Sequence, residues 1–304
     1  MEIIEKKLKV SVCVVTYNHE KYIRKCLQSL VDQQVNFFFE IVVGDDCSTD
    51  GTRVIIEEFE ASYPKIIKPI YRTSNIGALA NYMDTHNKAK GDYVAHMDGD
   101  DYALPDKLML QAYKFDIKND INILWHRMQF FNNNNIIIEH PSPNSPFVDV
   151  NISRVDLMLY GSFGSNSSMM YRRKNFSLRY QNFQALDWLL SVDLIGNGVG
   201  LMMPEVLGAY RVHSGGISGG ARANSKIREL FCNCQLELIN RFPEYRPEIA
   251  LRAFFVGILD LIAFRSYFKK SLNVLLQSKR FPRVMSIHKL VKFYKYSKLP
   301  SEFR

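Results

Sequence analysis

Residues 93–101 read Tyr-Val-Ala-His-Met-Asp-Gly-Asp-Asp, a mostly apolar run that ends in a cluster of acids. The run predicts a short buried strand over Tyr93–Met97. Asp98, Asp100 and Asp101 follow it directly, so three carboxylates fall within four residues. This spacing places the acids where a strand of the predicted sheet ends.

Strand patterns of this kind alternate with helix patterns through the first 125 residues. We predict strands at Lys9–Thr16, Phe38–Val43, Ile66–Ile70, Tyr93–Met97 and Asn122–Trp125, and helices at Tyr22–Val31, Thr52–Phe59, Ala78–Ala89 and from Pro105 onward. Repeated alternation predicts a mostly parallel, doubly wound α/β sheet with flanking helices. Ligands of such sheets bind at the carboxyl ends of the strands.

Beyond Trp125 the pattern is less regular, and it becomes helical from Asn224 onward. We predict a turn at Asn132–Asn135, a helix at Ser153–Tyr160, a strand at Ser168–Tyr171, a helix at Leu186–Ile195 and a strand at Val206–Val212. The expected organisation is therefore an α/β domain over residues 1–220 and a basic helical C-terminal region over residues 221–304.

The composition excludes several classes of protein. The 304 residues are 47% hydrophobic and 23% charged, which excludes a mainly disordered chain. No apolar run reaches the ~18 residues of a membrane-spanning helix, and the N-terminus lacks a signal-peptide cleavage region. We expect a cytoplasmic protein. Its five cysteines follow no disulfide framework, and Cys232-x-Cys234 indicates helix packing rather than zinc binding.

The net charge of +8 is concentrated at the C-terminal end. Residues 246–304 hold thirteen Lys and Arg against three acids, so the remaining chain is slightly acidic. A basic tail on a nearly neutral body indicates an anionic partner, whether lipid, nucleic acid or a phosphorylated substrate.

A second acidic cluster, Asp45, Asp46 and Asp50, follows the strand predicted at Phe38–Val43. The carboxyl ends of parallel strands form one crevice, so both clusters are expected to face one pocket. The alternative is that Ser48 or Asp50 caps the next helix and that the remaining acids are solvated loop residues. For the crowded Asp98 and Asp100 we favour a shared Mg²⁺ or Mn²⁺ that bridges to a di- or triphosphate.

Other nucleotide-binding signatures are missing or misplaced. The sequence contains no G-x-x-x-x-G-K-[ST] loop. Gly196-x-Gly198-x-Gly200 follows a predicted helix rather than a strand, so a turn is the better interpretation. A bound nucleotide would therefore be held mainly through carboxylates and a cation.

Seven segments occur in an order that is specific when they are taken together. They are residues 14–18 (Val-Val-Thr-Tyr-Asn), residues 43–52 (Val-Gly-Asp-Asp-Cys-Ser-Thr-Asp-Gly-Thr), Asn75-x-Gly77, residues 89–101 with their Asp98-Gly-Asp100, residues 105–108 (Pro-Asp-Lys-Leu), residues 186–188 (Leu-Asp-Trp), and residues 210–218 from Tyr210 to Ser218. Over about its first 215 residues the chain resembles the inverting, GT-A-fold glycosyltransferases of family 2.

The resemblance implies transfer of a sugar from a nucleoside-diphosphate sugar, expected to be a UDP-sugar, to a saccharide or lipid-linked saccharide acceptor. It assigns Asp187 as catalytic base, and Asp100 and His213 as ligands of Mn²⁺ or Mg²⁺. The residues implied in binding the donor nucleotide are Thr16, Tyr17, Asn18, Glu20, Asp46, Asn75, Gly77 and Asp98.

One position departs from the family pattern, because Leu186 stands where the family usually has Glu before the Asp. An acid at the start of a helix, favoured by the helix dipole, is therefore the alternative for Asp187. The alternative for His213 is a loop histidine beside glycines. His19, His96 and His126 are predicted to be structural or surface residues.

Two other functions would share some of these features. A sugar nucleotidyltransferase would use the same sheet and carboxylates, but it should have a Gly-rich basic loop after the first strand. A non-catalytic carbohydrate- or polyanion-binding protein would explain the basic tail alone. For the enzyme we expect no nucleic-acid partner. Its basic C-terminal helices could lie on the anionic inner face of the cell membrane or could only cover the core.

Overall fold

The computed structural model describes residues 8–132, 135–176, 187–212, 221–262, 268–279 and 291. Its strands are β1 (Leu8–Thr16), β2 (Phe38–Asp45), β3 (Ile67–Tyr71), β4 (Tyr93–Asp98), β5 (Tyr102–Ala103), β6 (Ile121–Asn132), β7 (Asn135–His140), β8 (Asn151–Ile152), β9 (Met170–Arg172) and β10 (Val199–Arg211). Its helices are α1 (Ile23–Val31), α2 (Thr52–Ser62), α3 (Ala78–Asn87), α4 (Lys107–Ile117), α5 (Arg154–Tyr160), α6 (Asp187–Leu194), α7 (Ala221–Arg241), α8 (Arg246–Ile262) and α9 (Phe268–Ser278).

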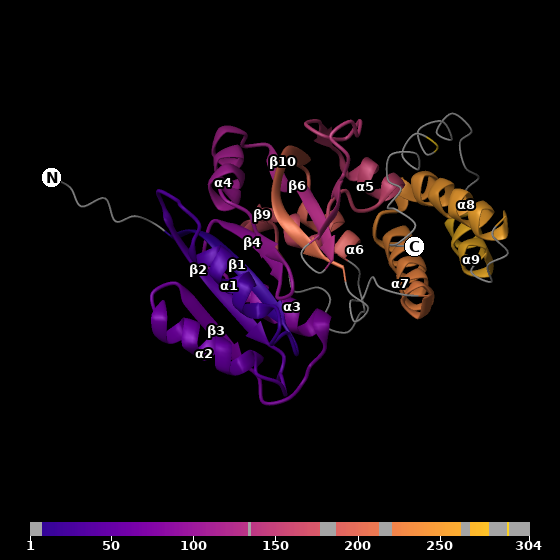
Figure 1. Cartoon of the computed structure of the whole chain (residues 1–304). Helices are drawn as coiled ribbons and strands as arrows, with labels where there is room; N and C mark the ends of the chain where they lie inside the picture. Colours follow the sequence, from indigo (N-terminus) through magenta and orange to yellow (C-terminus); the bar gives the residue numbers. More distant parts are fainter. Residues whose placement is uncertain are drawn as a thin grey trace.

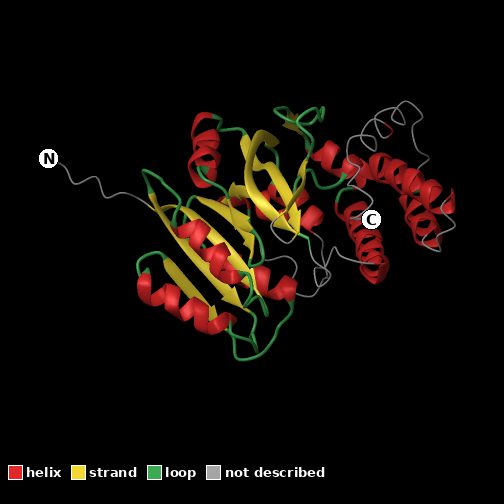
Figure 2. Cartoon of the chain, in the orientation of Figure 1, coloured by secondary structure: helices red, strands yellow, loops and turns green. Residues whose placement is uncertain are grey.

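The strands form one twisted sheet with helices packed against it (Figure 1, Figure 2). Its order is β3-β2-β1-β4-β9-β6-β10-β5, with β7 paired to β6 and β8 to β10. Strands β1 to β4 are parallel neighbours, as the alternating sequence pattern predicted. The short strand β9 lies between β4 and β6 and is antiparallel to both, so the sheet is mixed.

Several observed boundaries differ from the predicted ones, and β6 runs to Asn132, seven residues beyond the predicted end at Trp125. Helix α4 begins at Lys107 rather than at Pro105, because Asp106 has a left-handed φ of 65° that no helix continues through. Strand β10 begins at Val199, seven residues before the predicted start, and it pairs in parallel with β6 despite register shifts around Val206. The turn predicted near Asn133 and Asn134 lies outside the described residues.

The sheet separates two hydrophobic clusters. Alternate side chains of β1 enter different clusters, since Val12 and Val14 face one and Cys13 faces the other. The first cluster includes residues of α1, α2 and α4, and the second includes residues of α3, α5 and α6. This two-sided burial explains why β1 reads as a continuous apolar run.

The C-terminal helices pack on the second cluster rather than standing apart from it. The Phe231 ring of α7 stacks on Trp188 of α6 at 4.6 Å, and Arg252 of α8 donates to the Leu159 carbonyl at 2.9 Å. Cys232 and Cys234 are both buried in α7, in agreement with the interpretation as helix packing. Among the described helices, none is long and apolar enough to cross a membrane.

Candidate active site

The carboxyl ends of β1, β2 and β4 meet at one edge of the sheet. In the parallel register, Thr16 pairs with Asp45 and Val15 pairs with Asp98. The backbone N–H of Asp46 also donates to the Thr16 carbonyl at 3.0 Å. The two acidic clusters therefore lie on either side of the end of β1, as the sequence predicted.

The loops that follow β1 and β2 are tied together by hydrogen bonds. The Asn18 N–H donates to Ser48 Oγ at 2.9 Å, and Asn18 Oδ1 accepts from the Thr49 N–H at 2.8 Å. Glu20 Oε2 accepts from the Gly51 N–H at 3.1 Å. The side chains of Asn18 and Glu20, both predicted to bind nucleotide, thus shape the loops of the expected nucleotide pocket.

Two acids of the cluster that follows β2 have structural partners. The fully buried Asp45 carboxylate accepts two hydrogen bonds from Arg53, at 2.9 and 3.0 Å. Asp50 accepts from the N–H groups of Thr52 and Glu20 at 3.0 and 3.1 Å. Burial opposes ionisation of Asp50, but these hydrogen bonds outweigh it and lower its pKa. These contacts support the alternative interpretation of Asp50, in which its carboxylate stabilises the start of α2.

The Asp46 carboxylate organises the segment that follows β3. Its oxygens accept from the Ile76 N–H at 2.8 Å and the Gly77 N–H at 2.9 Å, while Asn75 Nδ2 donates to the Asp46 carbonyl at 3.1 Å. Gly77 has a φ of 89°, a conformation that a side chain would strain. The structure thus brings together Asp46, Asn75 and Gly77, three of the predicted nucleotide-binding residues.

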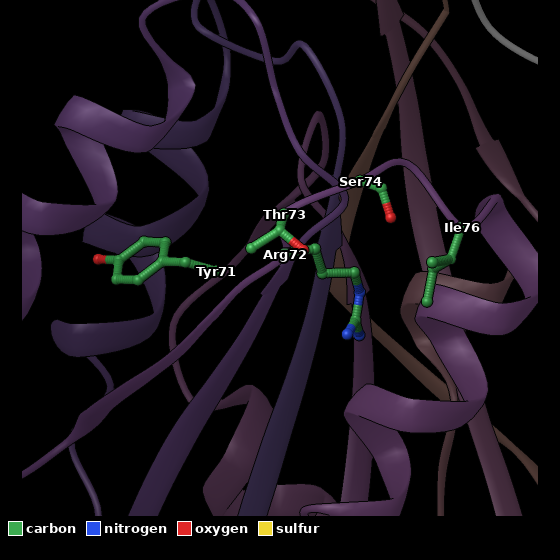
Figure 3. A pocket seen from close by; sticks show the side chains of 5 residues that line it. All are labelled: Tyr71, Arg72, Thr73, Ser74 and Ile76. Carbon is green, nitrogen blue, oxygen red and sulfur yellow. The ribbon is translucent and has the colours of Figure 1, made fainter.

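A pocket of about 250 Å³ opens beside Asp46. Figure 3 shows its lining, with Arg72, Thr73 and Ser74 between Tyr71 and Ile76. The Arg72 guanidinium is fixed by Asn81 and Asp84 at 2.8 to 3.1 Å, and its Nε lies 3.9 Å from Asp46 Oδ1. Its position next to Asp46 makes this pocket the candidate site for the nucleobase.

Thr16 and Tyr17, at the end of β1, differ in exposure. The Thr16 hydroxyl is buried and has no hydrogen-bond partner among the described residues. The Tyr17 side chain is 44% exposed, so its ring is available to a ligand. Both positions agree with the predicted nucleotide loop.

Asp98 is held by hydrogen bonds to both carboxylate oxygens. His96 Nε2 donates to Oδ1 at 3.1 Å, and the Ser167 hydroxyl donates to Oδ2 at 3.3 Å. Burial opposes ionisation, yet His96, His19 and Ser167 together lower the pKa of Asp98. His96 was predicted to be a structural or surface residue, and it is buried and supports Asp98, because alternation along β4 turns residues 96 and 98 to the same side.

The neighbouring Asp101 has fewer compensating contacts. It is 2% exposed and accepts from the Arg211 N–H at 2.8 Å through Oδ1. Its Oδ2 is buried, and the nearby Ser167 hydroxyl donates to Asp98 instead. Burial, followed by the negative charges of Asp100 and Asp98, raises the pKa of Asp101 well above its usual value. Three carboxylates crowded in this way create a local field that favours a cation.

Asp187 is the first residue of α6, and its Oδ1 accepts from the Trp188 N–H at 2.8 Å. Trp188 fixes this end of the helix, because its buried indole Nε1 donates to the Leu157 carbonyl at 2.7 Å. Burial raises the pKa of Asp187, and the charge of Asp98 raises it further against the effect of the Trp188 hydrogen bond. Asp187 is therefore within electrostatic reach of Asp98. Leu186 and His213 lie outside the described residues.

The donor set at the end of β4 suits a hard divalent cation. No group of three metal-ligating side chains occurs in the described ranges, but Mg²⁺ and Mn²⁺ commonly bind one or two carboxylates together with phosphate oxygens. A Cβ on Gly99 would lie 2.8 Å from Thr16 Oγ1 and 2.9 Å from His19 Nδ1, two buried atoms without partners in the described part. Gly99 thus keeps the backbone between Asp98 and Asp100 close to this polar surface.

Several residues of the site were not singled out in the sequence. Ser167 lies outside the seven segments, and Arg211 and Lys107 lie inside two of them without an assigned role. Only the folded sheet places Ser167 and Arg211 beside the acids of β4. Lys107 is fully buried and donates to His126 Nε2 at 2.7 Å and to the Ser167 carbonyl at 2.9 Å. Burial lowers the pKa of Lys107 to about 7. The structural role predicted for His126 is confirmed, since it is buried and supports Lys107.

The comparisons with known proteins agree with this geometry. The family model described as "Glycosyl transferase family 2" matches residues 11–178. The chain belongs to this family, whose members are inverting enzymes that depend on nucleotide-sugar donors. An uncharacterised Mycobacterium tuberculosis protein is 34% identical over 213 residues, which are 68% of this chain and 60% of that protein. The chain thus spans about three fifths of that relative's length.

Two solved structures show the same fold. TarS of S. aureus in complex with UDP-GlcNAc has a TM-score of 0.67 and 21% identity, and the match covers 89% of this chain and 81% of that one. The mannosyltransferase PcManGT of Pyrobaculum calidifontis, in complex with GDP-Man and Mn²⁺, has a TM-score of 0.57 and 14% identity over 97% and 81% of the two chains. These likenesses confirm the predicted GT-A architecture.

Proposed function

We propose that this protein transfers a sugar from a UDP-sugar to a hydroxyl of a saccharide or lipid-linked saccharide, with inversion and with Mn²⁺ or Mg²⁺. The observation that carries this proposal is the position of Asp187 at the start of α6, within electrostatic reach of Asp98 at the end of β4, where desolvation and the charge of Asp98 raise the Asp187 pKa. A partly buried carboxylate with a raised pKa suits a general base.

The pocket beside β3 would bind the nucleobase of the donor. Asp46 holds the N–H groups of Ile76 and Gly77 in place, and Arg72 carries a positive charge next to the pocket. Thr16 and Tyr17 border the same loops, with the Tyr17 ring exposed. UDP in the TarS structure supports a uridine nucleotide at this position.

The acids of β4 would bind the diphosphate end of the donor. Asp100 and His213 would hold the cation, which neutralises charge on the departing diphosphate. Asp98 would contact the ribose or a water bound to the cation. The orientation of Asp98 is already set by His96 and Ser167 before a donor arrives.

Asp187 would accept the proton of the acceptor hydroxyl while that oxygen attacks the anomeric carbon from the face opposite the diphosphate. One displacement of this kind inverts the anomeric configuration. The packing of Trp188 against Phe231 and the Leu157 carbonyl keeps the base in position.

A donor screen tests the proposal directly. The purified protein is incubated with UDP-, GDP- and dTDP-sugars and Mn²⁺, and the thermal shift and the release of nucleoside diphosphate are measured. We expect a UDP-sugar to raise the midpoint of thermal unfolding and to be hydrolysed slowly or transferred. Release of pyrophosphate, or no response to any donor, would contradict the proposal.

We further propose that residues 1–220 form the catalytic domain, and that the basic region 221–304 places it on the anionic inner face of the cell membrane. Helix α8 buries one face, including Ile249 and Ala253, but leaves Leu261 and Ile262 56% and 68% exposed. On α9, Leu276 is 67% exposed. Apolar side chains near Lys and Arg suit a helix that lies on an anionic bilayer.

Co-sedimentation with vesicles of increasing anionic lipid content tests this placement. The variant that combines Ile262→Asp with Leu276→Asp should lose binding, whereas Val54→Asp, at a 58% exposed position of α2, should not. Equal binding to neutral and anionic vesicles, or equal loss in both variants, would exclude the proposed surface.

A further inference from the structure

A chain of three hydrogen bonds runs beneath the site and ends on Asp98. Tyr171 of β9 bonds through its hydroxyl to His86 Nδ1 at 2.7 Å, and His86 Nε2 bonds to His96 Nδ1 at 2.9 Å. His96 Nε2 completes the chain at Asp98 Oδ1, at 3.1 Å. We call Tyr171, His86 and His96 the relay.

The relay has one consistent direction. An ionised Asp98 has no proton to give, so His96 must donate from Nε2. The relay uses both nitrogens of each ring once, and a charge on either ring would be buried among aromatic side chains. With both rings neutral, His86 donates from Nε2 to His96, and Tyr171 donates to His86 Nδ1.

The relay is packed too tightly to reorient on its own. Tyr171 and His96 are fully buried, and His86 is 1% exposed. The Tyr82 ring stacks on His86 with centroids 3.8 Å apart and planes 17° apart, and the Tyr171 ring lies within 9° of the His86 plane with centroids 5.8 Å apart. Such a stack fixes both imidazole planes and therefore the line along which His96 Nε2 meets Asp98.

We propose that Tyr171, His86 and His96 are positioning residues that hold the Asp98 carboxylate, through successive N–H and O–H donors, in the orientation that binds the nucleoside-diphosphate donor. Hydrogen bonds in series polarise one another, so the distant Tyr171 hydroxyl strengthens the bond that His96 makes to Asp98. The identity of this ligand rests on the proposed function, but the relay itself exists without a donor.

The tautomers of the two histidines provide the first test. Long-range ¹H–¹⁵N NMR on the ligand-free protein with ¹⁵N-labelled histidine distinguishes a proton on Nε2 from one on Nδ1. We expect both His86 and His96 as neutral Nε2–H tautomers, with a changed His86 signal in Tyr171→Phe. An Nδ1–H tautomer at either residue would reverse the chain and overturn the proposal.

Calorimetric titration with UDP and Mn²⁺ provides the second test. His96→Phe keeps the ring volume without a donor, and we expect the Kd of UDP to rise about 10- to 100-fold, as for other residues that orient a ligand-binding group. His96→Gln restores an N–H donor and should recover part of that loss. Tyr171→Phe, which removes only the far end of the chain, should raise the Kd about 3- to 10-fold.

Tyr82→Phe is the matched control, because Tyr82 belongs to the same aromatic stack and its buried hydroxyl has no hydrogen-bond partner in the described part of the chain. Its Kd should stay within about 2-fold of the wild type. Equal weakening in Tyr82→Phe and Tyr171→Phe would assign the effect to packing and overturn the relay. A wild-type protein that binds no UDP while showing both Nε2–H tautomers would contradict the proposed donor and leave the relay's geometry intact, so the two failures are distinguishable.

Discussion

The two acidic loops of the site differ in how their carboxylates are compensated. In the loop after β2, Asp45 is paired with Arg53, and Asp46 accepts two backbone N–H groups from the segment after β3. In the loop after β4, Asp101 keeps a buried oxygen without a hydrogen-bond partner among the described residues, and its pKa is raised by burial and by its acidic neighbours. We call these loops the nucleotide side and the reaction side.

This difference indicates what each acid is for. Compensated carboxylates on the nucleotide side build a rigid surface, and they do so without a ligand. On the reaction side, burial and the charge of Asp98 raise the pKa of Asp187 as well, so a proton or a cation would be stabilised beside these carboxylates. The two sides can be tested separately.

The largest effect is expected for Asp187→Asn. The amide cannot accept a proton from the acceptor hydroxyl, so transfer should fall about 10²- to 10⁴-fold, while the affinity for UDP and Mn²⁺ stays close to that of the wild type. Steady-state transfer assays and calorimetric titration measure the two quantities. A parallel loss of UDP binding would show that Asp187 serves the donor site instead.

The order of strands β1 to β4 and their helices could be predicted from the sequence, because each buried parallel strand is a short apolar run bounded by turn residues. Both acidic loops could be located for the same reason, since a strand that ends in acids places them at one edge of the sheet. Family resemblance, rather than spacing, supplied the role of Asp187.

The contacts that distinguish the reaction side from the nucleotide side could not be predicted from apolar runs and strand ends. Ser167 and Arg211 reach the β4 loop only because β9 and β10 enter the sheet beside β4 and β6, and these pairings are long-range. The bond from His96 to Asp98 could not be predicted either, because a buried histidine in a strand has the same sequence appearance whether it packs in the core or bonds to Asp98.

The next largest effect concerns the nucleotide side. Asp45→Asn places an amide N–H against the Arg53 guanidinium and removes the charge of a carboxylate that is fully buried in its ion pair. We expect the free energy of unfolding to fall by about 2 to 3 kcal/mol, as when one partner of a buried pair is removed. Urea denaturation measures it.

Asp84→Asn is the control for that experiment. Asp84 also pairs with an arginine, Arg72, at 2.8 Å, but its side chain is 39% exposed. An ion pair with an exposed carboxylate contributes less than about 1 kcal/mol. If both variants lost the same free energy of unfolding, burial of the Asp45 carboxylate would not make its pair with Arg53 the more stabilising of the two.

Asp100→Asn acts on the reaction side with a smaller expected change in free energy. Loss of one charged ligand should reduce the Mn²⁺-dependent part of UDP binding at least about 10-fold, with little change in stability. Titration of UDP with and without Mn²⁺ measures that part. Asp116→Asn, in the exposed pair with Lys9, is the control. Undiminished Mn²⁺ dependence in Asp100→Asn would exclude Asp100 as a ligand.

The smallest expected effect is on how the free energy of unfolding depends on pH. Because the pKa of Asp101 is raised in the folded protein, folding takes up a proton between the unfolded and folded pKa values. The stability from this group is therefore complete below the unfolded pKa, near 4, and is lost as pH rises through the folded pKa. The slope is at most about 1.4 kcal/mol per pH unit.

Asp101→Asn removes that titration while keeping an oxygen to accept from the Arg211 N–H. We expect the variant to gain stability over the wild type as the pH rises above 4, measured by urea denaturation in EDTA. Mn²⁺ with UDP should reduce the gain, because a bound cation compensates the same charge in the wild type. Identical pH profiles for the two proteins would mean that the charge of Asp101 is as well compensated as that of Asp45, and the contrast between the two sides would fail at Asp101.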